Sequence, residues 1–167
     1  MTLEATAPDR PDTMSEASMP TPALIAHILE RYHQTHRREL PELIELARKV
    51  ERVHRRHPQA PLGMGDLLAL IADDLEMHQQ KEEQILFPMM LNAAGPMVHH
   101  PIARMMIEHE DVEAQLAVLD EMSDGLTPPA NACGSWRRLY EGCRKFREDL
   151  RAHIRIEDTV LFPRFLD

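Results

Sequence analysis

Several residue types and patterns are scarce in this chain of 167 residues, and each scarcity excludes a class of protein. Aromatic residues make up only 4%, so leucine, isoleucine, valine and the 11 methionines must fill the core. The net charge is −9, which disfavours partners such as nucleic acids and anionic membranes. No apolar run reaches the length of about 18 residues that a membrane-spanning helix needs, so we expect no such helix.

Cysteine is also scarce, because Cys133 and Cys143 are the only two in the chain. They form no CxxC motif, and we expect two unpaired thiols rather than a disulfide. The first residues lack the basic and apolar segments of a signal peptide. These features together predict a cytoplasmic protein.

Histidine, in contrast, is frequent, and two of the 10 histidines open a repeated motif. His78 and Glu82 stand four residues apart, as do His153 and Glu157, and both copies read H-x3-E-x3-[IV]-L-F-P. On a helix, residues i and i+4 share a face, so each copy offers an imidazole and a carboxylate together. One such pair is common on helix surfaces, whereas two copies with the same apolar tail indicate metal ligands.

Apolar residues recur at spacings of three and four in four blocks of the chain, and no block alternates with the period of a strand. Segments rich in glycine and proline separate the blocks at 57–63, 92–96 and 123–129. Thr21-Pro22 is typical of a helix start, whereas residues 1–20 predict a disordered leader. The sequence predicts an all-α fold, an up-down-up-down four-helix bundle over residues 21–167, with that leader before it.

Polar residues interrupt the apolar faces that these helices would turn toward the core, where an unpaired carboxylate is unfavourable. The same faces include Ile85 and Val160, which we expect to be buried. A helix rises about 1.5 Å per residue, so the distance of each polar residue from the proline near its helix end gives its height in the bundle. By this measure the interrupting histidines lie roughly 12–17 Å from one end of the bundle, and the glutamates lie one turn closer to that end. They predict a dinuclear metal site with six ligands: His33, His78, Glu82, His109, His153 and Glu157.

Other polar residues fit this site less well. His54 lies about 31 Å beyond His33 along a continuous helix, so both cannot bind one centre, although Pro41 could kink that helix. We interpret His54 as a histidine of the far end and His36 as a hydrogen-bonded core histidine. Glu113 is expected to accept a hydrogen bond from a ligand histidine rather than to bridge the metals.

Histidine and carboxylate without thiolate disfavour a structural zinc site and suit iron, with manganese and zinc as alternatives. If Glu82 and Glu157 both bridge, two irons keep open positions for an oxo or hydroxo bridge, for water, or for a diatomic ligand such as O2 or NO. Asp74, one turn before His78, and Glu108, beside His109, are candidates for the path of protons or iron.

From about Thr21 to Phe165 the chain resembles the haemerythrin-like domain of the repair-of-iron-centres (ScdA-type) proteins. The matching stretches are Arg31–His33, Leu40–Ile44, Lys49–His54, His78–Pro88, Glu108–Glu110 and His153–Arg164. The resemblance implies a cytosolic non-haem di-iron protein that acts against nitrosative and oxidative stress. It also implies the restoration of damaged iron–sulfur clusters in a client protein, and the binding or reduction of nitric oxide. The family commonly has a small cysteine-containing N-terminal domain, where we expect only the leader here.

Three hypotheses remain open at this point. The first is a di-iron stress protein that binds NO, with or without reduction to N2O, or that supplies iron for cluster repair. The second is a haemerythrin-type carrier or sensor of O2 or NO without turnover, and the third is a metal-free bundle with a buried polar network. We expect a monomer or a weak dimer in each case.

Overall fold

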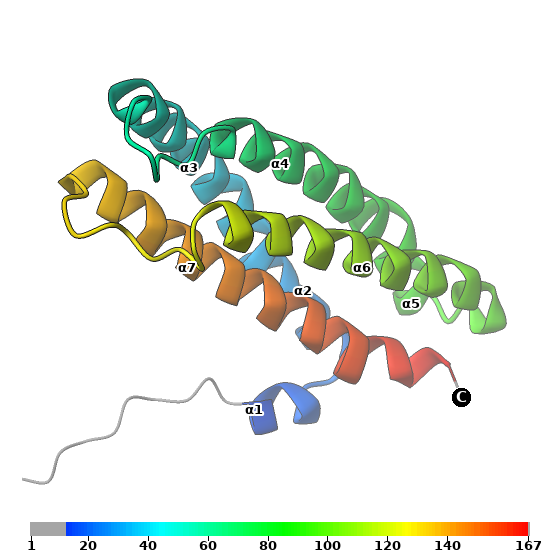
Figure 1. Ribbon diagram of the computed structural model, residues 1–167. Coiled ribbons are helices and arrows are strands. Elements are labelled where there is room, and N and C mark those ends of the chain that lie inside the picture. The colour runs from blue at the N-terminus through cyan, green and yellow to red at the C-terminus, as the bar shows by residue number, and fades with distance from the viewer. Residues whose placement is uncertain (1–12, 167) are drawn as a thin grey trace, which may run out of the picture.

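The computed structural model describes residues 13–166, which form helices and no strand. Four long helical rods lie side by side, and successive rods run in opposite directions (Figure 1). α3 packs against both α4 and α7, and α4 packs against α6. The predicted all-α four-helix bundle is confirmed.

Each rod consists of consecutive helical segments. The first contains α2 (Thr21–Ile28), η1 (Leu29–His33) and α3 (Gln34–His54). The second contains α4 (Met64–Lys81), η2 (Glu82–Leu86) and α5 (Phe87–Leu91). The third contains η3 (Gly95–Val98) and α6 (His99–Met122), and the fourth contains α7 (Gly134–Ile156), η4 (Glu157–Leu161) and η5 (Phe162–Phe165). The segments η1, η2 and η4 are π-helical turns, and η3 and η5 are 3-10 turns.

A short helix, α1 (Thr13–Ser18), precedes the first rod and lies within the stretch predicted to be a leader. Arg164, near the other end of the chain, donates a hydrogen bond to the carbonyl oxygen of Met19 at 2.9 Å. The segment after α1 is therefore attached to the end of the fourth rod. Residues 1–12, the remainder of the predicted leader, lie outside the described residues.

Glu51 fixes the connection between the first two rods. Its two carboxylate oxygens accept hydrogen bonds from the backbone N–H groups of Gly65 at 2.6 Å and Gly63 at 3.2 Å. These groups belong to the start of α4, where backbone donors have no partner within the helix. Gly63 has a φ of 90°, which glycine adopts without steric cost. The chain can therefore reverse direction and begin the second rod at once.

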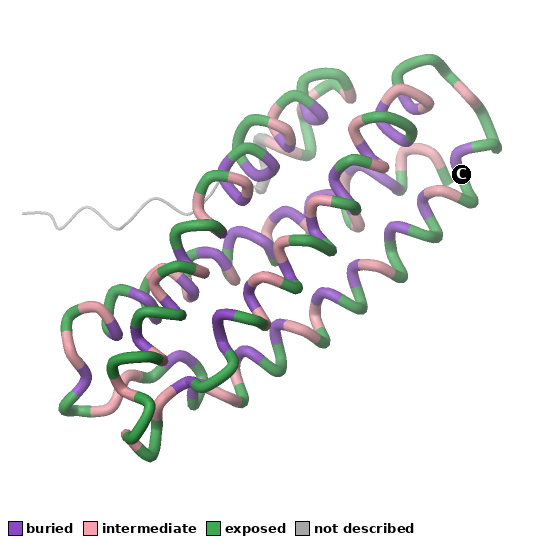
Figure 2. Tube along the Cα trace, turned by 90° about the horizontal axis from the view of Figure 1, so that it is seen from above, coloured by how far each residue is buried: buried purple, intermediate pink, exposed green. Residues whose placement is uncertain are grey.

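The core consists of two apolar clusters with a polar layer between them. Buried residues face the interior along all four rods (Figure 2). The larger cluster is built around Trp136 and Phe146, and the smaller one around Phe87 and Phe162. On every rod the buried histidines and glutamates lie between residues of the two clusters. The polar layer therefore crosses the whole bundle.

Ile85 was predicted to lie in the core but is exposed, and Val160 packs only at the edge of the smaller cluster. Ile85 is 53% exposed, whereas Leu86 is 1% exposed. Val160 is only partly buried, whereas Leu161 is fully buried. A π turn contains an extra residue, so each residue after it is displaced by one position around the helix. The π turns η2 and η4 therefore bring the following leucine, rather than the expected residue, to the core.

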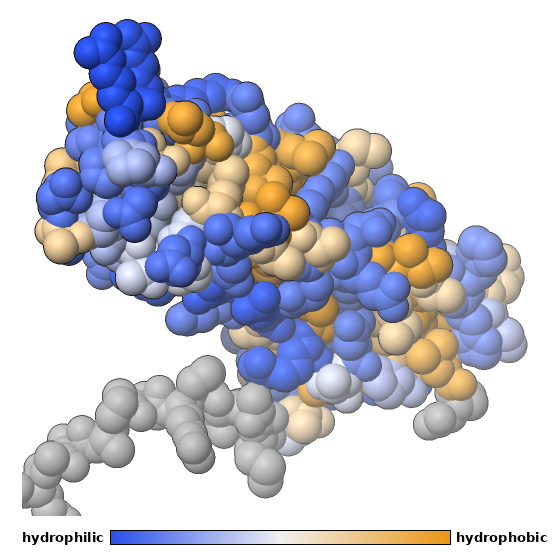
Figure 3. Space-filling model, viewed as in Figure 1, coloured by the Kyte–Doolittle hydropathy of each residue, from blue (hydrophilic) through white to orange (hydrophobic). Residues whose placement is uncertain are grey.

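The surface mixes polar and apolar side chains, and on the face shown in Figure 3 the apolar groups are separated by hydrophilic ones. Large apolar residues are exposed on several rods, among them Leu70, Met77 and Ile107. Among the helices that the structure describes, none is both long and apolar enough to cross a lipid bilayer.

Candidate metal centre

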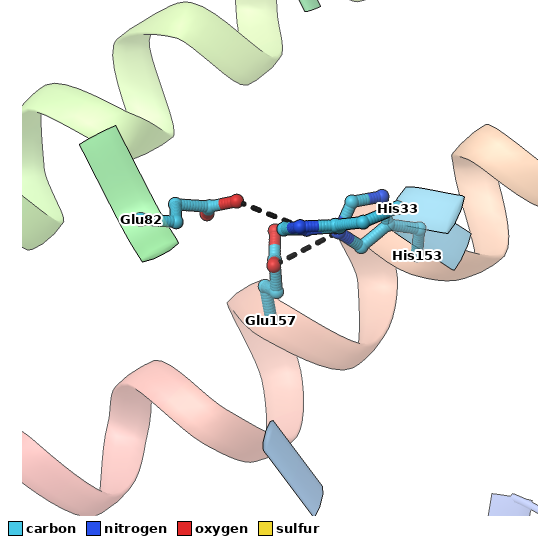
Figure 4. A group of neighbouring side chains, drawn as sticks. All are labelled: His33, Glu82, His153 and Glu157. Atoms are coloured by element: carbon cyan, nitrogen blue, oxygen red, sulfur yellow. Dashed lines mark hydrogen bonds and ion pairs between the residues drawn. The ribbon is translucent and has the colours of Figure 1, made fainter. Parts of the chain in front are cut away.

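Six buried side chains meet in the polar layer and form two groups of four: His33, Glu82, His153 and Glu157 in one, and His78, Glu82, His109 and Glu157 in the other. The potential ligand atoms of each group lie within 4.8 Å of one another. Figure 4 shows the first group, in which imidazoles from two rods point toward carboxylates from two rods. The structure therefore brings together all six predicted ligands, and both groups share the two glutamates.

Each glutamate presents one oxygen to each pair of histidines. Glu82 Oε2 lies 3.3 Å from Nε2 of His33, and its Oε1 lies 3.3 Å from Nε2 of His78. Glu157 Oε1 lies 2.9 Å from Nε2 of His153, and its Oε2 lies 3.2 Å from Nε2 of the remaining histidine. This is the placement that two carboxylates need to bridge two neighbouring cations.

The π turns lie at the ligand positions. Glu82 is the first residue of η2, Glu157 is the first residue of η4, and His33 is the last residue of η1. The backbone N–H groups of Phe87 and Phe162 donate to the carbonyl oxygens of these two glutamates, five residues earlier. Such wide turns are frequent at functional sites because they reorient side chains within a helix.

The two glutamates need positive charge beside them. Both are fully buried, and within the described part of the chain neither oxygen of Glu82 nor Oε2 of Glu157 has a hydrogen-bond partner. A buried carboxylate without such partners is unfavourable unless a cation compensates it. Two imidazole nitrogens and two carboxylate oxygens per group suit a transition-metal cation. The residues present therefore fit a pair of metal ions.

In the absence of metal, protonated histidines supply this positive charge. Burial lowers the pKa of His109, but the hydrogen bond to Asp158 and the ion pair with Glu157 outweigh burial and raise it to about 10. Burial also opposes charge on His33 and His78, yet Glu82 raises the pKa of both. Burial raises the pKa of Glu157, but the neighbouring histidines hold it well below its usual range. A metal ion would take the place of these protons.

Three of the four histidines have a carboxylate at the ring nitrogen that faces away from the centre. The three pairs, each measured from Nδ1, are His33–Glu83 at 2.8 Å, His78–Glu108 at 3.0 Å and His109–Asp158 at 2.9 Å. A partner of this kind fixes the tautomer and orientation of a ligand histidine and makes it a stronger donor.

Glu83 and Asp158 were not among the residues predicted from the sequence. Each directly follows one of the two shared glutamates but supports a histidine of another rod. An acidic residue after the glutamate in both copies of the repeated motif is the signal that identifies them. Glu113, which was expected to support a ligand histidine, instead pairs with Arg151 at 3.1 Å on the surface.

Both residues predicted for the path of protons or iron line one pocket beside the centre. This pocket has a volume of about 210 Å³, and His78, Asp74, Glu108 and Asp111 are among its lining residues. Burial raises the pKa of Glu108, but hydrogen bonds from Lys81 and other neighbours lower it to about 2. Glu108 therefore stays charged. The pocket connects acidic groups with a predicted ligand, and their role in transport stays a prediction.

The two remaining histidines of the first rod differ from each other. His54 lies at the far end, where its Nε2 is 3.0 Å from Sγ of Cys133, because α3 continues through Pro41. His36 is 1% exposed, as expected of a core residue. Among the described residues, however, neither of its ring nitrogens has the expected hydrogen-bond partner. Both cysteines of the chain are free thiols, as predicted.

Residues 24–165 match the Hemerythrin HHE cation binding domain, a match that covers all four rods. The chain belongs to this family. A cation-binding domain accords with the two groups of buried histidine and glutamate side chains that could hold metal ions. The predicted relation to haemerythrin-like domains is therefore confirmed.

Similar proteins carry the name iron-sulfur cluster repair protein YtfE. The protein of Dickeya chrysanthemi (strain Ech1591) is 46% identical over 143 residues, which are 86% of this chain and 65% of that protein. The protein of Musicola paradisiaca (strain Ech703) is 46% identical over 156 residues, 93% of this chain and 70% of that protein. The chain thus spans about two thirds of the length of these relatives. Their names confirm the predicted resemblance to iron-centre repair proteins.

Proposed function

We propose that the chain is a non-haem di-iron protein that supports the repair of iron–sulfur clusters under nitrosative and oxidative stress and binds nitric oxide. The observation that carries this proposal is the pair of buried glutamates, each with one oxygen toward either pair of histidines. The names of the relatives support the role in repair. Glu82 and Glu157 would bridge the irons, and four histidines would bind them terminally: His33, His78, His109 and His153.

Two bound irons would supply electrons and open coordination positions for a diatomic ligand. The chain supplies a dry and rigid setting, since all six ligand residues are at most 3% exposed. Phe87 stacks on His33 and Phe162 stacks on His109, each with 6.0 Å between ring centroids. These aromatic rings exclude water from the side of the smaller apolar cluster. Three outer carboxylates, Glu83 among them, keep the Nε2 atoms of three of the four histidines directed at the centre.

The acidic pocket beside His78 supports a role in moving iron. Asp74 and Glu108 line it together with Asp111, and carboxylates attract hydrated cations. We infer that ferrous iron enters or leaves through this pocket, and that the partner that receives it is an iron–sulfur client protein.

A second candidate function is a haemerythrin-type carrier or sensor of O2 or NO without turnover. The observation that favours it is the enclosure of the site, because a shell that excludes water suits reversible binding of a small gas. Both candidates use the same metal ligands. They differ in whether bound NO is converted to product.

The state of the cysteines bears on the compartment in which the protein works. Cys133 and Cys143 are free thiols, and cysteines in the cytoplasm are normally kept reduced. We therefore propose a cytoplasmic protein, present as a monomer or a weak dimer. The molecular mass measured in solution would test the proposed oligomeric state.

The decisive experiment is the metal content and the ultraviolet–visible spectrum of anaerobically purified protein, before and after addition of NO. Two irons per chain and a spectrum that changes with NO would support the proposal. One zinc, or no metal, would contradict it. Steady N2O production by the reduced protein would then identify a reductase, whereas reversible spectral change without N2O would identify a carrier. Reactivation of an NO-damaged iron–sulfur enzyme tests the repair role separately.

A further inference from the structure

His153 differs from the other three histidines of the centre because it has no carboxylate at Nδ1. This atom is buried and has no hydrogen-bond partner in the part of the chain that the structure describes. Its ring instead contacts two others, which also lie close to each other, with 6.3 Å between the ring centroids of Tyr32 and His36. Tyr32 stacks on it with 5.3 Å between ring centroids and 9° between planes, and His36 stacks with 5.6 Å and 29°. Stacking holds the plane of the ring but leaves Nδ1 without a hydrogen bond.

Two neighbouring side chains also have buried polar atoms without partners. His36 and Gln79 are each 1% exposed, and both ring nitrogens of His36 and Nε2 of Gln79 make no hydrogen bond to described residues. Leaving a buried polar group unsatisfied costs about 1–3 kcal/mol, so such groups normally bind water where no protein group is near. A neutral imidazole has one donor and one acceptor nitrogen, so His36 could both donate a hydrogen bond and accept one.

A pocket of about 150 Å³ between α3 and α4 joins these two side chains. His36 and Gln79 line it together with apolar residues such as Leu40 and Leu75. A water molecule occupies about 30 Å³ in the liquid, so the pocket has room for several. The charged residues of its lining, Arg37 and Glu76, bind each other at 2.7 Å.

We propose that this pocket is an internal water site, and that water held by His36 and Gln79 hydrogen-bonds to Nδ1 of His153. The donors and acceptors match, because His153 Nδ1–H and the Gln79 amide can donate to the water oxygen while the water donates to a nitrogen of His36. The ring centroids of His36 and His153 are 5.6 Å apart, a separation that one water with two hydrogen bonds of about 2.8 Å can bridge. His36 is then a positioning residue for the ligand His153.

The water site makes the two metal positions unequal, a consequence that rests on the proposed di-iron function. At one metal position a carboxylate supports His33 but not His153. At the other position carboxylates support both histidines, His78 and His109. A neutral water makes its histidine a weaker donor than a carboxylate does. The ion beside His153 therefore dissociates first, and it depends on His36.

The test is anaerobic release of ferrous iron from the loaded full-length chain to a chromogenic chelator. Wild type should lose its two irons in two phases. His36→Phe keeps a ring against Phe146 but removes both nitrogens. It should accelerate the fast phase about tenfold and leave the slow phase unchanged, since loss of a ligand's supporting partner weakens metal binding about 10–100-fold. Gln79→Met should act in the same direction, and His36→Gln should restore slower release.

His54→Phe is the matched control, because His54 lies at the far end of the bundle beside Cys133. This variant should release both irons as wild type does. Equal release rates for wild type, His36→Phe and Gln79→Met would overturn the proposal. If His36→Phe does not fold, Gln79→Met decides the matter alone.

Nuclear magnetic resonance gives a readout that does not depend on iron release. In zinc-loaded protein, the Nδ1–H proton of His153 should show cross-relaxation with water, and His36→Phe should abolish it. Absence of that signal in wild type would overturn the water site. If wild type binds no metal at all, the proposed function fails. The water contacts of the Gln79 amide in metal-free protein would still test the water site, and their absence would refute it.

Discussion

Replacing Glu82 with glutamine is the sharpest test of a shared carboxylate at the metal centre. The substitution preserves the shape of the side chain but removes its charge and one oxygen donor. Glu82 is fully buried, and its two oxygens lie 3.3 Å from histidines of both pairs. If it bridges, one ion loses its ligand oxygen and both ions lose the negative charge that they share. The loss should therefore affect both metals rather than one.

The magnitude follows from the burial of this group. Removal of one partner from a buried ionic contact costs about 3–5 kcal/mol. In a binding equilibrium this corresponds to roughly 10²–10⁴-fold weaker affinity for metal. Dialysis against a chelator concentration at which wild type keeps two irons per chain should leave Glu82→Gln with fewer than one. Elemental analysis measures the metal, and far-ultraviolet circular dichroism shows whether the bundle is folded.

Glu83→Gln is the matched control. It makes the same substitution at the next residue, a glutamate that lies at the edge of the centre and is not a predicted metal ligand. Glu83 contacts the outer nitrogen of His33 at 2.8 Å and is partly exposed. Its loss should weaken one ion by about 10–100-fold. Iron retention should fall in the order wild type, Glu83→Gln, Glu82→Gln. A folded Glu82→Gln protein that holds two irons as tightly as wild type would refute the bridging assignment.

Three further predictions concern the metal-free chain and the helix packing. In metal-free protein, the raised pKa of His109 should stabilise the folded state. This contribution to the free energy of unfolding is present in full below pH 6.5 and is lost as the pH rises through about 10. Urea unfolding measured across this pH range would detect the loss. Loading two ferrous ions at pH 6 should release about three protons, one from each histidine whose pKa is raised, as measured by pH-stat titration. Gly142→Ala should lower the free energy of unfolding by about 1–3 kcal/mol, because an added Cβ would lie 2.6 Å from Cδ2 of Leu43. Gly134→Ala, where nothing lies within 4 Å, should leave the free energy of unfolding unchanged.

The fold and the meeting of the six side chains could be predicted because helical geometry converts sequence spacing into height along the bundle. An interruption such as His109 in an otherwise apolar face can be recognised from one helix alone. Support of a ligand by another rod, as Glu83 supports His33, depends on how the rods pack. Spacing within one helix does not say which histidine such an acidic residue supports, so these pairings became apparent only in the structure.

The π turns explain why Ile85 is exposed and why Val160 is less buried than Leu161. The prediction assumed alternating spacings of three and four residues, and each wide turn breaks this periodicity. Pro88 and Pro163 follow the ends of η2 and η4 by two residues. Proline lacks an N–H group, and its ring crowds the carbonyl oxygen of the preceding turn, which disfavours a regular α-helix there. The same proline offset in both copies is therefore a usable signal for the wide turns.

The division of the core by the polar layer has a consequence for how the molecule unfolds. The cluster around Trp136 and the cluster around Phe162 are two separate apolar units. The six side chains between them come from all four rods, so a pair of ions would join every rod at mid-height. Loaded protein should then exchange its amide hydrogens as one cooperative unit, whereas metal-free protein should open from the end that contains Phe162. Metal content thus determines the size of the unit that unfolds.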